Sequence, residues 1–318
     1  TIEMNTTEVL KTPSTIIFQT KSILDRSYQL FEENRIHDGA SNLIEGIRSI
    51  YNPTQSETFK SELKLFCLNH PILEYLKQEA TVAHSLLKPR GYSGDADMID
   101  YFYRLKPNNK NSTYFGRELH NTLMDATSSS SVRWRAKHLS ELFQYIYQEK
   151  EAAIDVLSVA SGHIRELGYV ENKNQIFNKF IALDQDNKSN DEARSSYSGQ
   201  FLNILDESIS YILKDGFKNQ EYDFVYSAGL FDYLNDRLAS KLIQKLYACV
   251  KKGGSLLVPN FAKGITERAF MDIFMDWELI YRNEEDMMGL AKNAGVPEES
   301  ISLYRDPMHN VIYMKISK

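Results

Sequence analysis

The feature that most constrains the fold is a change of pattern near residue 152. Before that point, apolar residues recur at three- and four-residue spacing, which is typical of amphipathic helices. Beyond it, short apolar runs alternate with helical segments, and the runs are too short to form independent helices. Buried strands that alternate with helices predict right-handed crossovers and a parallel sheet. The runs cover residues 153–160, 180–183, 201–205, 224–226 and 255–258.

The C-terminal stretch follows a different pattern. Residues 301–304 and 311–316 alternate apolar and polar side chains around a turn at 306–310, which predicts a β-hairpin. We therefore expect an α/β fold in which residues 151–318 form a doubly wound, Rossmann-like sheet that ends in this hairpin. Residues 1–150 are expected to form an all-helical N-terminal region.

Turn and cap signals divide the expected helices. His70-Pro71 separates two of them, because proline lacks an amide proton and disfavours helix in the residue before it. Residues 88–95, Lys-Pro-Arg-Gly-Tyr-Ser-Gly-Asp, predict a turn-rich loop. An amphipathic pattern at 236–250 is followed by Lys-Lys-Gly-Gly, which favours a helix C-terminus there. The other expected helices span 16–34, 39–50, 56–68, 72–86, 117–126 and 132–148.

The composition excludes some classes of function. With 37 Lys and Arg against 43 Asp and Glu, the net charge of −6 argues against a general nucleic-acid binder, although a local basic pocket remains open. No apolar run approaches the ~20 residues of a membrane-spanning helix. Residues 1–9 lack the pattern of a secretory signal. We expect a cytoplasmic protein in which Cys67 and Cys249 are buried, reduced thiols.

The ends of the first two predicted strands carry the strongest signal for a ligand. Ligands of open parallel sheets bind outside the carboxyl ends of the strands. Small residues around Gly162 would let the backbone approach a ligand, and Asp184, about 20 residues further on, is placed to accept the hydroxyls of a ribose. Gly162 is the one glycine where a pyrophosphate site favours three, so a nucleoside without phosphates, such as S-adenosylmethionine, fits better. The alternative is that small residues are common in any such turn.

A second small-residue turn follows the fourth strand. Ser227, Ala228 and Gly229 would again bring backbone close to a cofactor. Just beyond, Asp232 could orient a substrate hydroxyl or cap the next helix. Phe231 and Tyr233 could face a substrate or pack under that helix.

Several of these segments together resemble a known superfamily. They are similar to the class I S-adenosylmethionine-dependent methyltransferases and, more narrowly, to the bacterial family that makes the methyl ester of 3-hydroxypalmitic acid. The resemblance runs from about residue 88 to 285, and its longest matches are hard to obtain by chance. The matching segments are 88–95 with Met98 and Tyr101, 131–135, 183–186, 226–234, 252–254 with 260–261, and 276–282.

The resemblance implies a binding role for residues at the ends of several strands. The methionine part of the cofactor would pass Gly162, the ribose would bind Asp184, and the sulfonium would lie next to the 227–229 turn. The chain departs from the superfamily at Ser158, where an acidic residue is frequent, and at Ala160, where glycine is frequent. The remaining implied contacts are Gln185, Ser208 and Ile209, the last two beside the adenine, and Tyr92 in a loop that folds over the cofactor or forms a tight turn.

Three residues are candidates for catalysis. His163 could act as a base, or it could cap a helix or contact the cofactor. Arg282, with Trp277 and Tyr281, could hold a carboxylate in two hydrogen bonds, or it could form a structural ion pair. Asp232, which could orient a substrate hydroxyl, is the third. Arg133 and Arg135 could reach the carboxylate of the cofactor or lie on the surface, and no metal site is predicted.

The predicted function is methyl transfer from S-adenosylmethionine to a small molecule. The favoured acceptor is an oxygen, specifically the carboxylate of a fatty or hydroxy acid. The alternatives are an N-methyltransferase acting on a metabolite or peptide, and a binding module without catalysis. The helical half is expected to form a lid and an acceptor pocket, and its aromatic residues suit a lipid-like acceptor as well as an ordinary core. A homodimer is a further expectation.

Overall fold

The computed structural model describes residues 13–106 and 112–318. The chain forms two compact units, each built from several separate segments of the sequence. The sequence pattern predicted one boundary, at residue 150. The helical unit is drawn from residues 1–93, 107–124 and 266–278, and the sheet unit from residues 94–106, 125–265 and 279–318. The searched residues contain no helix that is long and apolar enough to cross a membrane.

The helical unit is built on two helices that approach each other closely. Glycines in the second of them face the first, because a Cβ at Gly39 would lie 2.5 Å from the ring of Phe31, and one at Gly46 would lie 2.5 Å from Ile23. The expected segment 72–86 is two helices. The helices of this unit are α1 (Pro13–Glu32), α2 (Ile36–Ile50), α3 (Glu57–Leu68), α4 (Ile72–Leu76), α5 (Ala80–Leu87), α7 (Tyr114–Met124) and α13 (Arg268–Phe274).

A buried carboxylate explains why α4 and α5 are separate. Glu79 is extended, and its side chain accepts a hydrogen bond from the backbone N–H of Val82 and one from the hydroxyl of Thr81, both at 2.7 Å. Its second oxygen lies 2.6 Å from Nδ1 of His120 on α7. Glu79 therefore begins α5 as its N-cap and ties α5 to α7.

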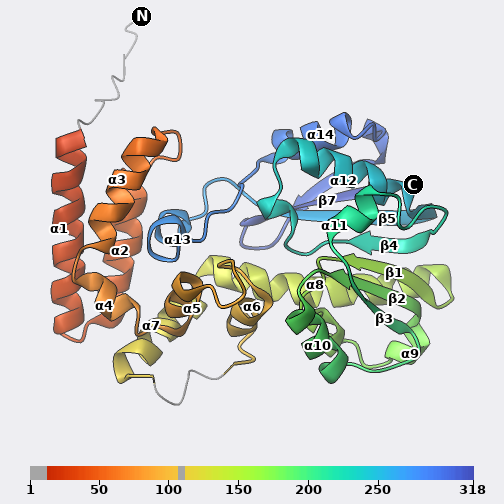
Figure 1. Ribbon diagram of the computed structural model, residues 1–318, viewed down its shortest axis with the longest axis horizontal. Coiled ribbons are helices and arrows are strands. Elements are labelled where there is room, and N and C mark those ends of the chain that lie inside the picture. The colour runs from red at the N-terminus through yellow and green to blue at the C-terminus, as the bar shows by residue number, and fades with distance from the viewer. Residues whose placement is uncertain (1–12, 107–111) are drawn as a thin grey trace, which may run out of the picture. The chain divides into compact units, whose positions relative to one another are not determined.

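The sheet unit contains seven strands in the order β3-β2-β1-β4-β5-β7-β6 (Figure 1). The first five strands pair in parallel, and β7 runs antiparallel to both β5 and β6. The predicted doubly wound fold with a C-terminal hairpin is confirmed. The strands are β1 (Ile154–Val159), β2 (Phe177–Asp184), β3 (Leu202–Asp206), β4 (Tyr222–Tyr226), β5 (Val250–Phe261), β6 (Ile301–Arg305) and β7 (Val311–Ser317).

Helices cover both faces of this sheet. Val225 of β4 belongs to the buried cluster that α12 and α14 complete, whereas the rings of Phe224 and Tyr226 pack against Phe143 of α8 on the other face. This alternation is the pattern of a strand that is buried on both sides. The helices of the unit are α6 (Ala96–Phe102), α8 (Thr127–Lys150), α9 (Lys173–Ile176), α10 (Asn187–Ser196), α11 (Ile209–Leu213), α12 (Asp236–Ala248) and α14 (Glu284–Asn293), with 3₁₀-helices η1 (Arg165–Tyr169), η2 (Phe231–Tyr233) and η3 (Glu298–Ser300).

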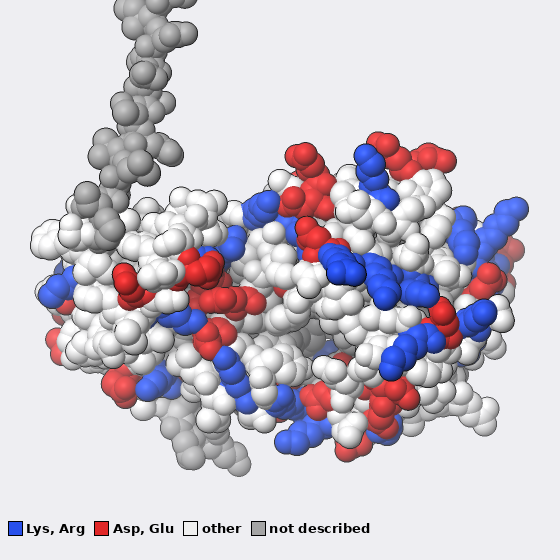
Figure 2. Space-filling view, turned by 45° about the horizontal axis from the view of Figure 1, so that its top comes forward, with Lys and Arg blue, Asp and Glu red and all other residues white. Residues whose placement is uncertain are grey.

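One cap prediction is wrong. The Lys-Lys-Gly-Gly segment at 251–254 belongs to β5, and α12 already ends at Ala248. Gly254 lies against the backbone of Asp223, where a Cβ would be 2.7 Å from the carbonyl oxygen, so glycine is needed for strand pairing. The two cysteines are free and buried, as expected. Both basic and acidic side chains lie on the face drawn in Figure 2.

Candidate active site

The carboxyl ends of the central strands lie in register. Ser158 of β1 pairs with Ala182 of β2 on one side and with Tyr226 of β4 on the other. The strand order reverses between β1 and β4, which is where ligands of such sheets bind. The loops after β1 and β4 therefore meet at the predicted binding edge. We call residues 160–164 the β1 loop and residues 227–230 the β4 loop.

The β1 loop has an unusual backbone. Ala160, Gly162 and Ile164 all have left-handed φ angles, of 52°, 56° and 52°. Two of these residues carry a Cβ, so the conformation costs about 1–2 kcal/mol at each of them. Such strain persists where the surroundings hold the backbone, and it is concentrated at functional sites. A fixed, tightly turned loop thus follows β1 at the binding edge.

Asp184 holds this loop to the end of β2. Its Oδ2 accepts a hydrogen bond of 2.8 Å from the backbone N–H of Gly162, and its Oδ1 accepts one of 2.8 Å from the backbone N–H of Asp186. Burial raises the pKa of the Asp184 carboxyl. The structure therefore brings together Gly162 and Asp184, the two residues on which the cofactor prediction rests. Gln185 is exposed beside them.

The β4 loop is joined to β1 by a side chain. The buried hydroxyl of Ser227 donates a hydrogen bond of 2.7 Å to the carbonyl oxygen of Val159. Ser158 is buried one residue earlier, at the pairing described above. Ser227 therefore fixes the start of the β4 loop, and its neighbours Ala228 and Gly229 continue the turn. This leaves backbone, rather than the serine hydroxyl, as the surface available to a ligand.

The expected adenine contacts follow β3. Asp206 at the end of β3 pairs in register with Asp184. Ser208, two residues later, caps α11 by accepting a hydrogen bond of 3.2 Å from the backbone N–H of Ser210, and Ile209 begins that helix. These residues lie beyond the strand end next to the expected ribose position.

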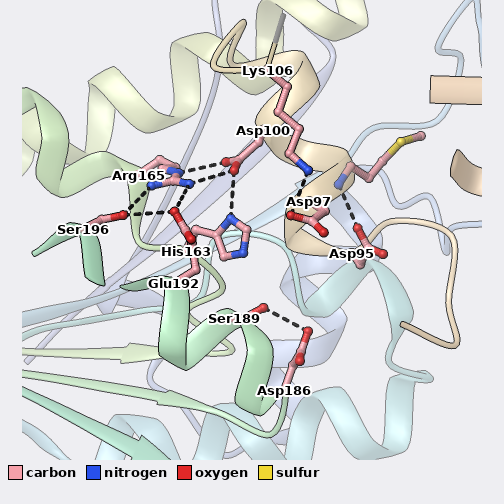
Figure 3. A network of polar contacts seen from close by, with 11 residues as sticks. Asp95, Asp97, Asp100, Lys106, His163, Arg165, Asp186, Ser189, Glu192 and Ser196 are labelled. Atoms are coloured by element: carbon pink, nitrogen blue, oxygen red, sulfur yellow. Dashed lines mark hydrogen bonds and ion pairs between the residues drawn. The ribbon is translucent and has the colours of Figure 1, made fainter. Parts of the chain in front are cut away.

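Helix α6 covers the β1 loop. A Cβ at Gly162 would lie 3.4 Å from the Cβ of Ala96. Further along the helix, Asp100 accepts a hydrogen bond of 2.9 Å at Oδ1 from Nε of Arg165 and one of 2.8 Å at Oδ2 from its Nη2. Oδ2 also lies 2.9 Å from Nδ1 of His163 (Figure 3). Burial opposes ionisation of Asp100, but the bonds from Arg165 and His163 outweigh it and lower its pKa to about 2.

His163 is therefore part of a buried charged network. Its Nδ1 faces Asp100, and the ring's other nitrogen points away from that carboxylate in Figure 3. Asp97, Asp100 and His163 lie close enough to hold a metal ion. However, Lys106 already pairs with Asp97 at 2.9 Å, and Arg165 occupies both oxygens of Asp100. A metal would have to displace these cations. Asp100 was not among the residues singled out from the sequence.

Arg282 is buried, and its guanidinium bonds to protein groups. The side chain is 2% exposed. Its Nη1 donates to the carbonyl oxygen of Phe231 at 2.8 Å and to Oδ1 of Asn260 at 2.7 Å. Its Nη2 donates to the carbonyl oxygen of Leu234 at 2.5 Å and to Oδ1 of Asp236 at 2.9 Å. The guanidinium thus links η2 to β5 through protein groups.

Asp232 is not the helix cap that one interpretation predicted. Asn235 fills that position, since its side chain accepts a hydrogen bond of 2.9 Å from the backbone N–H of Leu238. Asp232 is buried, and its Oδ1 accepts a hydrogen bond of 2.7 Å from the backbone N–H of Phe261. Burial raises its pKa to about 6. Phe231 next to it is fully buried, which indicates packing.

Two residues that the sequence analysis assigned to the site belong to the helical unit. Tyr92 is 40% exposed there, and Trp277 is buried. Ser93, next to Tyr92, donates a hydrogen bond of 2.6 Å to the carbonyl oxygen of Asp276. Asp276 also pairs with Lys64 and Lys88. The segment around Tyr92 is therefore anchored within the helical unit by its neighbours.

Comparison with known proteins supports the fold. No family model and no curated protein matches the sequence. A possible exported protein from Bordetella parapertussis has a similar structure, with a TM-score of 0.54, 11% identity and coverage of 97% of each chain. Magnesium protoporphyrin IX methyltransferase from Synechocystis PCC 6803 with bound SAH has a TM-score of 0.45 and 10% identity, covering 75% of this chain and 99% of its own. The likeness to the Bordetella protein concerns the fold alone.

Proposed function

We propose that this protein is an S-adenosylmethionine-dependent methyltransferase that acts on a small molecule. The observation that carries the proposal is the Asp184 carboxylate, which holds the β1 loop at the point where the strand order reverses. A carboxylate at this strand end is suited to the hydroxyls of a ribose. The loop holds one glycine, Gly162, and no pyrophosphate-type glycine series, which favours a nucleoside without phosphates.

The residues at the edge fit such a nucleoside. Both oxygens of Asp184 accept backbone hydrogen bonds, and each oxygen keeps a further lone pair for a ribose hydroxyl. The hydroxyl of Ser161, inside the β1 loop, is buried and has no hydrogen-bond partner among the described residues, so a polar ligand atom would satisfy it. Residues 208–209 would lie beside the adenine, and residues 227–229 beside the sulfonium. Gln185 remains a proposed contact of the cofactor.

The cofactor would supply an electrophilic methyl group. The chain's own residues then have to orient the acceptor in line with that carbon and keep water out. A carboxylate acceptor needs no base, and a fatty or hydroxy-acid carboxylate is the acceptor that the family resemblance favours. For this acceptor, the buried Asp232 would act by position and not by proton transfer.

The pair formed by His163 and Asp100 favours a second candidate acceptor. A carboxylate that fixes one ring nitrogen orients the imidazole as in an acid–base pair. A hydroxyl or an amine must lose a proton during methylation, and His163, in the β1 loop, would take it. Product analysis separates the candidates, because mild alkali hydrolyses a methyl ester and leaves a methyl ether or an N-methyl group intact.

Calorimetric titration with S-adenosylmethionine and with S-adenosylhomocysteine tests the proposal. We expect micromolar binding of both. The Asp184→Ala variant should bind each about 10- to 100-fold more weakly, since a hydrogen bond to a charged group contributes about 1.5–3 kcal/mol. Asp191→Ala is the control, because Asp191 is an exposed residue of α10 that pairs with Arg194. Absence of binding to the unaltered protein, or equal affinity in the Asp184→Ala variant, would contradict the proposal.

A further inference from the structure

Arg135 is a buried cation whose hydrogen bonds are incomplete. It lies on α8 and is 5% exposed. Its Nε is buried and has no hydrogen-bond partner among the residues that the structure describes. Burying a guanidinium without full pairing is costly, and buried charges in proteins are paired or bind a ligand. Arg135 therefore calls for an acceptor group that the described part of the chain does not supply.

Arg135 lies against the β4 loop. A Cβ at Gly229 would be 3.8 Å from its Nη2 and 3.9 Å from its Nη1, which is van der Waals contact, so the guanidinium lies directly beside this residue of the loop. Tyr103, at the end of α6, forms a side-chain hydrogen bond with Arg135. The hydroxyl of Tyr313 on β7, which is electrostatically coupled to Arg135, is also buried without a partner among the described residues. Two groups without a partner among the described residues, the Arg135 Nε and the Tyr313 hydroxyl, thus interact with each other, and Arg135 lies against the loop proposed to face the sulfonium.

Two nearby carboxylates act on Arg135 through their charge but hold it in no ion pair among the described residues. Asp232 and Glu166 interact electrostatically with Arg135, but neither forms an ion pair with it among the described contacts. Asp232 accepts its hydrogen bond from the backbone of Phe261, and Glu166 accepts one of 2.5 Å from the hydroxyl of Tyr226. Burial raises the pKa of both carboxyls.

We infer that Arg135 binds the carboxylate of a ligand at the β4 loop. Nε and one Nη of an arginine match the two oxygens of a carboxylate, and Nε is the atom left without a partner. The inference rests on the proposed function for its choice of ligands. The carboxylate belongs either to the methionine part of the cofactor or to the acceptor. Both sources share the chemistry that Arg135 recognises, and binding experiments separate them.

The experiment compares ligands with and without the carboxylate. S-Adenosylhomocysteine carries the amino-acid part, and 5′-methylthioadenosine lacks it. Decanoate serves as an acceptor probe, with decanamide as its uncharged counterpart, in the presence of saturating S-adenosylhomocysteine. The variants are Arg135→Met, which removes the charge, and Arg135→Lys, which keeps the charge but loses the planar fork. Lys137→Met is the control, because Lys137 is an exposed cation on the same helix.

The results assign the source. If the cofactor supplies the carboxylate, Arg135→Met weakens S-adenosylhomocysteine binding about 10- to 100-fold and leaves 5′-methylthioadenosine binding unchanged. If the acceptor supplies it, cofactor binding is unchanged and the binding of decanoate is lost. In either case, Arg135→Lys weakens binding of the same ligand less than Arg135→Met does. Lys137→Met leaves binding of that ligand unchanged.

Other outcomes overturn the inference. Equal weakening of S-adenosylhomocysteine and 5′-methylthioadenosine would mean that Arg135 supports the fold of the site, and thermal unfolding of the variants would show it. If the Arg135→Met variant binds every ligand as well as the unaltered protein, Arg135 does not bind a ligand carboxylate. If the unaltered protein binds neither nucleoside, the proposed function fails. The decanoate titration, repeated without nucleoside, then decides the role of Arg135 by itself, and no difference between the unaltered protein and Arg135→Met would refute it.

Discussion

Replacing Asp100 with asparagine should destabilise the sheet unit by about 2–3 kcal/mol near pH 7. The carboxylate accepts two hydrogen bonds from Arg165 and faces His163, and together these lower its pKa from 3.8 to about 2. A shift of nearly two units corresponds to roughly 2.5 kcal/mol at 1.36 kcal/mol per unit. Asparagine keeps the shape but loses the charge, which leaves the partly buried guanidinium of Arg165 with one carboxylate, Glu192, at 3.0 Å.

The contribution of Asp100 depends on pH in a defined direction. Because its pKa is lower in the folded protein than in the unfolded chain, its ionised form stabilises the fold above about pH 4. This stabilisation is lost as the pH falls from about 4 toward 2. The difference in unfolding free energy between the unaltered protein and Asp100→Asn should therefore be constant above pH 5 and shrink below pH 4.

Urea unfolding followed by tryptophan fluorescence measures this difference. Trp134 belongs to the sheet unit, and replacing Trp277 with phenylalanine in all variants leaves Trp134 as the reporter. Asp97→Asn is the matched control, because Asp97 lies on the same helix and its pair with Lys106, beyond the helix end, is about one-third exposed and should contribute below about 1 kcal/mol. If Asp100→Asn lowers the free energy of unfolding no more than Asp97→Asn does, the contacts of Asp100 do not stabilise the packing of α6 on the β1 loop.

Three further substitutions probe the site and the packing around it. Gly162→Ala places a Cβ on a left-handed residue 3.4 Å from Ala96 and should cost about 1–2 kcal/mol in urea unfolding while weakening S-adenosylhomocysteine binding; unchanged binding would mean that the loop does not contact the cofactor. Ser227→Ala removes the buried bond to Val159 and should cost about 0.5–1.5 kcal/mol, a loss that Ser227→Thr should partly restore. Burial lowers the pKa of His138 to about 4, so the protein should lose stability as the pH falls from about 6.5 to 4, and His138→Phe should remove that part of the loss in urea titrations at pH 7 and pH 5.

The central part of the site was predictable because its signals are local in sequence. The short apolar runs reach the ends of β1, β2 and β4, and the carboxyl ends of parallel strands meet at one edge. The turn at Gly162 and the acidic residue Asp184 could therefore be placed together from their spacing alone. The structure adds the reason for this proximity, which is a hydrogen bond between the two residues.

The roles of other residues depended on distant contacts and could not be predicted. Arg282 bonds to groups 22 to 51 residues away, so its sequence left a carboxylate clamp and a structural role equally open. Asp100 meets His163 across 63 residues. The Lys-Lys-Gly-Gly segment at 251–254 shows a different difficulty, because glycine after lysines suits a helix end and also suits a strand that needs close backbone approach.

The strained β1 loop connects these observations. Ala160 and Ile164 adopt left-handed conformations without being glycine, so their neighbours must hold them there. Asp184 bonds to the loop's backbone, and the Ser227 hydroxyl fixes the strand end that precedes it. Asp100 on α6 holds His163 within it. A loop fixed from three sides is preorganised for a ligand without a glycine series. Its rigidity therefore depends on the hydrogen bonds of the Asp184 and Asp100 carboxylates, and removing either side chain should loosen the loop.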